Sequence, residues 1–216
     1  EDVRTTITQA NVNAPKGSFD GPRQSWSIGV NDQIETAAAL IGADPVDVAL
    51  IPSVGYGVAT AGKVLAIPRG SRVLVLKDDH TSPVLEWMSR AEAGGFTVEQ
   101  VAQPADGDWT TSVMAAIDRG GAAPLALVSI SSVHWSDGGA LDMARIAAAA
   151  RKQGAALLVD ATHDVGVRKI DVKTLDPDFL IFPTYKWVLG PYGRAFMASV
   201  DGHSEYAFHA ALQRVI

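Results

Sequence analysis

The chain contains 216 residues, of which 47% are hydrophobic and 19% are charged, and its formal net charge is −6. These values indicate a globular domain with a sizeable core, and the acidic balance without a basic block argues against nucleic acid as a partner. The chain has no apolar run near the ~20 residues of a membrane span. It also has no signal-peptide layout at its amino terminus and no cysteine for disulfides or thiolate metal sites, so we expect a cytoplasmic protein.

Apolar runs and helical patterns alternate along the chain. Residues 1–31 are polar and predict a loop-like arm. The expected helices cover residues 32–43, the stretch after Gly57 to about Pro68, and residues 83–95, 107–120 and 136–155. The expected strands cover residues 48–51, 72–77, 97–102, 125–130, 156–160, 179–182 and 194–199. This alternation predicts the α/β class, with a mostly parallel sheet covered by helices on both faces.

Capping residues mark the ends of several expected helices. Asn31 or Asp32 is expected to cap the first helix, which Gly42 ends, and Asp108 is expected to cap the helix over 107–120. Pro83 suits the first residue of its helix, because its missing N–H needs no partner there.

Polar residues follow several of the expected strands. Gly55 and Gly57 lie at a strand-to-helix turn, which suits either phosphate binding by backbone N–H groups or simply tight packing. His80 follows the strand over 72–77, where it is either a cleft residue or a solvated loop histidine. The neighbouring Asp78 and Asp79 make only a weak case for a metal, because adjacent residues rarely point at one ion; we expect no metal site.

Three more strand ends carry groups that suit cofactor chemistry. Ser132 follows the strand over 125–130, Asp160 ends the next strand, and Lys186 lies beyond the strand over 179–182. Carboxyl ends of parallel strands form the ligand cleft of open α/β sheets. There a lysine amine can form a Schiff base with pyridoxal phosphate, and an acid can pair with its pyridine nitrogen. The residues alone equally allow a capping aspartate and a solvated lysine.

Two sequence runs bear on this choice, VDATHDVG (159–166) and DPDFLIFPTYKWVLGPYG (176–193). They resemble the class V aminotransferase family of fold-type I pyridoxal phosphate enzymes, which includes cysteine desulfurases, kynureninase and isopenicillin N epimerase-like proteins. The resemblance covers roughly residues 45–200. It implies that Lys186 holds the cofactor as a Schiff base and moves the substrate's Cα proton, and that Asp160 pairs with the pyridine nitrogen.

The resemblance also implies roles for further residues. His163 would approach the phenolic oxygen of the cofactor, Ser132 stands where many members have an asparagine near that oxygen, and His80 would stack on the ring. The phosphate-cup region would contain Gly55, Tyr56, Thr184 and Tyr185. Two departures, Tyr185 for the histidine of desulfurases and Pro183 for their serine, favour the kynureninase-like and epimerase-like branches.

The resemblance implies a division of the chain. Residues 1–44 would form an amino-terminal arm with the first helix, residues 45–200 the cofactor-binding large domain, and residues 201–216 the start of a linker helix. That helix would lead towards a carboxyl-terminal small domain, which normally supplies an arginine for the substrate carboxylate and which this sequence lacks.

Three functions follow as hypotheses. The first is a homodimeric enzyme that acts on an amino acid as an aminotransferase, lyase or epimerase. The second is a non-catalytic or truncated homologue that acts as a binding or scaffold protein. The third, a nucleotide-binding domain, is disfavoured because the chain has neither a Gly-x-Gly-x-x-Gly turn nor a Gly-Lys-Ser/Thr loop.

Overall fold

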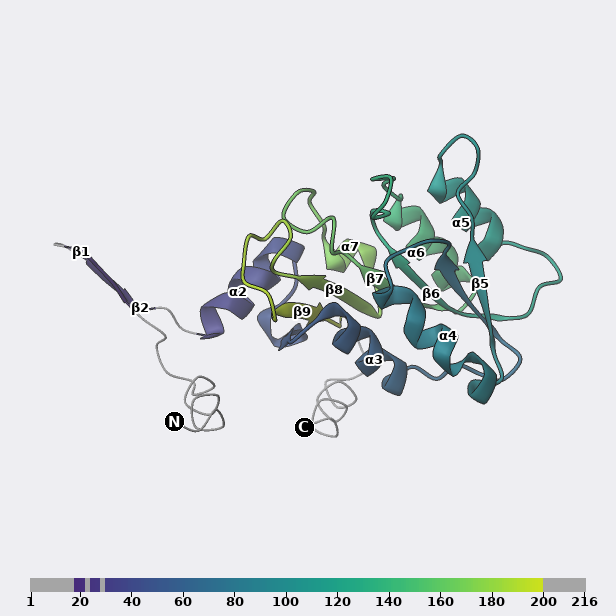
Figure 1. Cartoon of the computed structure of the whole chain (residues 1–216), viewed down its shortest axis with the longest axis horizontal. Coiled ribbons are helices and arrows are strands. Elements are labelled where there is room, and N and C mark those ends of the chain that lie inside the picture. Colours follow the sequence, from purple (N-terminus) through teal and green to yellow (C-terminus); the bar gives the residue numbers. More distant parts are fainter. Residues whose placement is uncertain (1–17, 22–23, 28–29, 200–216) are drawn as a thin grey trace.

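The computed structural model describes residues 18–21, 24–27 and 30–199, and a seven-stranded sheet forms its centre (Figure 1). In spatial order the strands are β3 (Val48–Ile51), β9 (Ala195–Ala198), β8 (Phe179–Pro183), β7 (Ala156–Asp160), β6 (Leu125–Ser131), β4 (Arg72–Leu76) and β5 (Thr97–Val101). β9 pairs antiparallel with β3 and β8, and the other pairings in this sheet are parallel. The prediction of a mostly parallel sheet is confirmed.

Helices cover both faces of the sheet, as the continuous apolar strands predict. The helices are α2 (Val30–Ile41), α3 (Val54–Val64), α4 (Ser82–Gly94), α5 (Trp109–Ile117), α6 (Met143–Lys152) and α7 (Val172–Leu175). Figure 1 shows α3 and α4 on one side of the sheet and α5, α6 and α7 on the other.

The alternation of side chains along each strand divides the core into two layers. In β4, Val73 and Val75 pack with the apolar faces of α3 and α4, whereas Leu74 and Leu76 pack with those of α2, α5, α6 and α7. Both sets are fully buried. Because successive side chains of a strand point to opposite faces, one uninterrupted apolar strand supplies both layers.

The boundaries of α3 differ from the prediction. Ser53 caps the helix, because its hydroxyl oxygen accepts the N–H of Tyr56 at 3.1 Å. Gly55 and Gly57 therefore lie in the first turn of α3 and not in a turn before it. The helix ends at Val64, several residues before the expected end near Pro68.

The expected helix over 136–155 is wrong in its first part. α6 begins at Met143, and Asp142 caps it by accepting the N–H of Arg145. Upstream, Gly138 has a φ of +71°, and Val133 forms an isolated bridge with Ala140. These contacts hold the segment before Asp142 as a loop. The expected cap at Asp108 and the helix end at Gly42 (φ +69°) are confirmed.

The amino-terminal arm is not entirely loop-like. Two short strands, β1 (Ser18–Gly21) and β2 (Gln24–Ser27), pair antiparallel, and α2 already begins at Val30, so neither Asn31 nor Asp32 caps it. Four-residue strands are too short for their alternation to be recognised in a sequence. The short helices η1 (Pro45–Asp47) and α7 were likewise not expected.

The expected helix over 201–216 and most of the arm lie outside the described residues. The division at residues 44 and 200 stays a prediction. Within the described ranges, no helix is both long and apolar enough to cross a membrane.

Candidate active site

The candidate site lies at the carboxyl ends of three neighbouring parallel strands, β4, β6 and β7. Ser131 at the end of β6 stands directly opposite Asp160 at the end of β7. Asp79, just beyond β4, reaches across to Ser131: its carboxylate accepts the Ser131 N–H at 3.1 Å and the Ser131 hydroxyl at 2.9 Å. Parallel pairing thus gathers two carboxylates at one edge of the sheet.

Asp160 is 1% exposed, and its two oxygens have different surroundings. Oδ1 accepts hydrogen bonds from the N–H of Thr162, at 2.9 Å, and from the Thr162 hydroxyl. Oδ2 is buried and has no hydrogen-bond partner among the described residues. Burial raises the pKa of this carboxyl to about 6, and the nearby charge of Asp79 adds to the rise. A buried acceptor without a donor is a natural place for a ligand N–H group.

Lys186 lies in the loop between β8 and β9, which Thr184 organises. The Thr184 hydroxyl donates to the carbonyl of Pro191 at 2.6 Å, and the Thr184 carbonyl accepts the N–H of Gly190 at 2.8 Å. A Cβ at Gly190 would lie 2.6 Å from the Cβ of Thr184, so this close approach requires glycine. Because Thr184 bonds within its own loop, its clearest role is to shape the loop that presents Lys186.

Aromatic rings flank the lysine. Tyr185 stacks on Tyr192, with ring centroids 4.4 Å apart and an angle of 14° between the planes. The Nζ atom of the exposed Lys186 lies 5.9 Å from the centroid of the Tyr185 ring. Burial raises the pKa of the Tyr185 phenol, and the charge of Asp160 contributes, which connects the lysine loop with the end of β7.

Two histidines face the same region. The His80 side chain is exposed, and the backbone N–H of His80 donates to Asp79 Oδ1 at 2.7 Å. His163 is partly buried, and its Nδ1 has no partner among the described residues. Burial lowers the pKa of His163, and the charges of Lys186 and His80 lower it further. The lowered pKa favours the neutral form of His163 at pH 7.

The amino-terminal turn of α3 offers a small, open surface. Gly55 is exposed, and a Cβ built on it would have no atom within 4 Å. Tyr56 is half-buried against the core layer of α3 and α4. The first N–H groups of a helix lack partners within it, so an anion can bind at such a turn.

Ser132 stands apart from the other expected site residues. Its N–H donates to the carbonyl of Asp160 at 3.0 Å, but its buried hydroxyl has no partner among the described residues. The residue lines a cavity of ≈ 660 Å³ together with Thr110, Asp164 and Arg168, beside α5, α6 and α7. Its expected position near the phenolic oxygen of the cofactor stays a prediction.

Sequence reasoning missed the residues that support the site. Asp79, Ser131 and Thr162 hold its polar groups, and Ser53 caps α3. The signal for Asp79 was present in the Asp78-Asp79-His80 run, which suggested only a weak metal site. Among the described residues there is no group of three or more His, Cys, Asp or Glu side chains that could hold a metal ion.

The fold and the site define an α/β protein whose strand ends carry a buried carboxylate oxygen without a partner among the described residues and, in the loop after β8, an exposed lysine. The family model for aminotransferase class-V matches residues 11–198. The chain therefore belongs to the class V aminotransferase family.

Curated relatives are between 26% and 30% identical to this chain over the segments that align with it. The uncharacterized aminotransferase YcbU of Bacillus subtilis is 30% identical over 171 residues, which are 74% of this chain and 41% of that protein. A probable cysteine desulfurase of Methanothermobacter thermautotrophicus is 27% identical, over 79% of this chain and 42% of its own length. Isopenicillin N epimerase of Streptomyces clavuligerus is 26% identical, over 79% of this chain and 43% of its own length. The chain thus spans about two-fifths of these relatives.

Solved structures share the fold. The apo cysteine desulfurase from Thermococcus onnurineus superposes with a TM-score of 0.70 at 22% identity, over 82% of this chain and 43% of that one. The cystine C–S lyase C-DES, in complex with cysteine persulfide, gives a TM-score of 0.67 at 23% identity, over 81% of this chain and 49% of that one.

Proposed function

We propose that the protein is a pyridoxal phosphate-dependent enzyme of the class V type that acts on an amino acid. The observation that carries the proposal is the buried Asp160 Oδ2, which has no partner among the described residues. The charge of Asp160 also helps to raise the pKa of Tyr185, the residue before Lys186. A related solved structure, a C-DES variant, carries glycine linked to its PLP cofactor.

The residues present fit this cofactor. The unpartnered Asp160 oxygen suits a protonated pyridine nitrogen, and Thr162 holds the other oxygen so that the carboxylate keeps one orientation. The exposed His80 ring suits one face of a flat ring, and the open turn at Gly55 suits a phosphate. The cofactor, when bound, withdraws electrons from the substrate's Cα and so eases the loss of its proton.

The chain's own residues would bind the cofactor and move protons. The Lys186 amine would attach the cofactor covalently and, once released by the substrate, would take or return the Cα proton. His163, kept neutral by burial and by the charge of Lys186, would donate a hydrogen bond to the cofactor's phenolic oxygen. Asp160, ionised against the pyridine nitrogen, would keep that nitrogen protonated.

The reaction stays open among transamination, lyase chemistry and epimerisation. The named relatives include an epimerase and a probable cysteine desulfurase, so similarity alone does not choose. Tyr185 and Pro183 favour the epimerase-like and kynureninase-like branches over desulfurases. No contact in the described part of the chain favours the scaffold alternative.

We also propose that the enzyme is a homodimer of the cytoplasm. The lysine loop carries large apolar side chains that are far from covered: Leu189 is 87% exposed and Tyr192 82%. Exposed apolar groups of this size around a site suit an interface. Light scattering over a range of concentrations would test the dimer, and a monomer at all concentrations would contradict it.

The proposed function is tested by reconstitution with pyridoxal phosphate. The protein should absorb near ~420 nm after binding, and borohydride should fix the cofactor on the peptide that contains Lys186. Lys186→Ala should lose the band, whereas the matched control Lys63→Ala, at an exposed lysine of α3, should keep it. A wild-type protein that stays colourless would overturn the proposal.

A further inference from the structure

The turn between β4 and α4 (residues 77–81) contains His80, and its backbone is strained at Asp78. Asp78 has a φ of +58°, in the left-handed region that non-glycine residues enter only at a cost. Such a conformation persists when surrounding contacts determine it. The contacts that hold this turn therefore also set where His80 lies.

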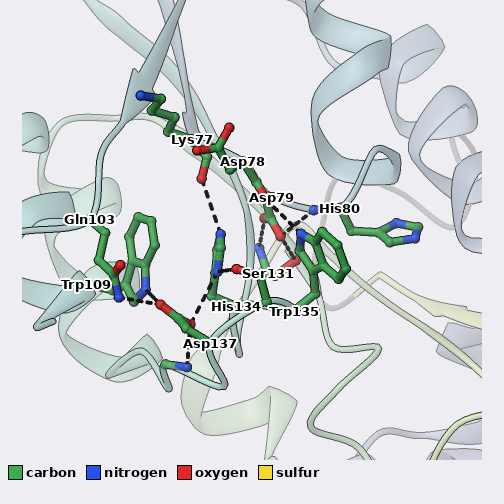
Figure 2. Close-up of polar contacts among 12 residues, drawn as sticks. Lys77, Asp78, Asp79, His80, Gln103, Trp109, Ser131, His134, Trp135 and Asp137 are labelled. Atoms are coloured by element: carbon green, nitrogen blue, oxygen red, sulfur yellow. Dashed lines mark hydrogen bonds and ion pairs between the residues drawn. The ribbon is translucent and has the colours of Figure 1, made fainter.

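The segment over residues 131–135, at the end of β6, supplies these contacts (Figure 2). Ser131 binds the Asp79 carboxylate with both its N–H and its hydroxyl, as described above. That carboxylate in turn accepts the N–H of His80 at 2.7 Å. The side chain that precedes His80 is thus tied to the next strand of the sheet.

Two ring N–H groups from the same segment bind the backbone of the turn. His134 Nε2 donates to the carbonyl of Lys77 at 3.2 Å, since a carbonyl can only accept. Trp135 Nε1 donates to the carbonyl of Asp78, the strained residue, at 2.7 Å. Each donor lies 57 residues beyond its acceptor in the sequence.

The His134 ring is itself held from behind. It is 2% exposed and stacks on Trp109, with ring centroids 4.4 Å apart. Asp137 binds both rings: its carboxylate accepts Trp109 Nε1 at 3.0 Å and lies 3.3 Å from His134 Nδ1. The His134 donor is therefore oriented by contacts that lie outside the turn.

We infer that His134 and Trp135 are positioning residues, which hold the turn at Asp78 in its left-handed conformation and so place His80 against the cofactor. The role of His80 rests on the proposed function, whereas the contacts to the turn do not. Trp135 is 54% exposed, so its indole N–H can be removed without opening a cavity in the core.

Amide hydrogen exchange of the purified, cofactor-free protein tests the contacts. Trp135→Phe should speed exchange about two- to tenfold, the worth of one hydrogen bond, in residues 77–82 and at Ser131 alone. Trp187→Phe is the matched control for exchange, because Trp187 is 53% exposed and makes no hydrogen bond to the turn within the described part of the chain. Unchanged exchange over 77–82 in Trp135→Phe would overturn the inference.

A second substitution separates positioning from a general loss of structure. Glycine enters the left-handed region at little cost, so Asp78→Gly should make the turn independent of the Trp135 bond. Trp135→Phe should weaken pyridoxal phosphate binding by up to about tenfold in the wild-type background. In the Asp78→Gly background it should have almost no effect.

Each result has a distinct meaning. An equal loss of affinity in both backgrounds would overturn the inference. If wild-type protein binds no cofactor, while Trp135→Phe still speeds exchange in the turn, the proposed function fails and the positioning contacts stand.

Discussion

The environment of Asp160 shows how a single residue combines folding and function. Its side chain is buried at the end of a strand, and Thr162 satisfies only one of its oxygens. Burial of an incompletely bonded carboxylate is unfavourable, because water no longer solvates its charge. The burial of Asp160 therefore makes the folded, cofactor-free protein less stable, and a cation bound at this carboxylate would remove that destabilisation.

The first prediction concerns the pH dependence of this cost. The pKa of Asp160 rises from an ordinary 3.8 to about 6 in the folded protein. Below pH 3.8 the Asp160 carboxyl is protonated in both the folded and the unfolded state, so its charge does not lower the stability. As the pH rises through about 6, the folded protein must ionise the buried carboxyl, and the folded state loses stability. Asp160→Asn, which carries no charge at any pH, should therefore stabilise the cofactor-free protein above pH 6, by on the order of 3 kcal/mol.

Urea unfolding of both proteins at pH 4 and pH 8 measures this difference. The free energies of unfolding should be similar at pH 4 and should diverge at pH 8. The variant should bind pyridoxal phosphate more weakly despite its greater stability. A stability difference that is the same at both pH values would show that the Asp160 charge is not its cause.

At the scale of an element, α3 divides its small residues between two tasks. Gly57 packs against the sheet, where a Cβ would lie 2.8 Å from Ile51 Cδ1 and 3.0 Å from Ile181 Cδ1. Gly55, two residues earlier, faces open space. One helical turn thus contains a glycine that packing requires and a glycine that only a ligand would require.

The second prediction compares alanine at these two positions. Gly57→Ala should lower the free energy of unfolding by about 1–3 kcal/mol, because the buried isoleucines must move. Gly55→Ala should raise it by up to about 1 kcal/mol, because alanine favours the helix and restricts the unfolded chain. Thermal unfolding of the cofactor-free variants checks both signs.

Cofactor affinity then separates the two tasks further. Gly55→Ala should weaken pyridoxal phosphate binding, because its methyl group would occupy the open turn. If Gly55→Ala binds the cofactor as well as the wild type, the phosphate lies elsewhere.

At the scale of the whole molecule, the two ends of the parallel strands have separate roles. The carboxyl ends carry the candidate site. At the amino end of β4, Arg72 is 4% exposed; it donates to the carbonyls of Ala123, at 2.9 Å, and Ile117, at 3.2 Å, and pairs with Glu99 at 3.0 Å. This end ties the strands together without facing the site.

The third prediction follows from that separation. Arg72→Met should destabilise the protein by about 3–5 kcal/mol, because it leaves Glu99 and two carbonyls without their buried donor. Arg119→Ala should cost less than about 1 kcal/mol, because Arg119 pairs with the same glutamate but its side chain is 56% exposed. Chemical unfolding measures both, and cofactor affinity well below the unfolding temperature should stay at the wild-type value. A large loss of affinity in Arg72→Met would contradict the separation.

Much of the fold could be predicted because its signals are local. Runs such as VLVL (73–76) and FLIFP (179–183) are apolar without interruption, and a strand buried on both faces has that composition. Asp108 marks a helix start by accepting the N–H of Thr111, and Gly42 marks a helix end because its φ of +69° suits glycine. The start of α6 was predicted too early, because the sequence over 136–142 does not reveal the bridge between Val133 and Ala140 that holds this segment as a loop.

The sequence by itself determined the class of the sheet and, through its resemblance to a family, predicted that Asp160 pairs with the pyridine nitrogen and that Lys186 holds the cofactor. Only the tertiary structure decided that β9 lies between β3 and β8, that Ser132 lines a cavity beside α5, α6 and α7, and that Ser131, His134 and Trp135 bind the turn that contains His80. The physical reason is distance along the chain. Strands and caps depend on neighbouring residues, whereas the contacts that hold the turn over residues 77–81 join residues more than 50 positions apart.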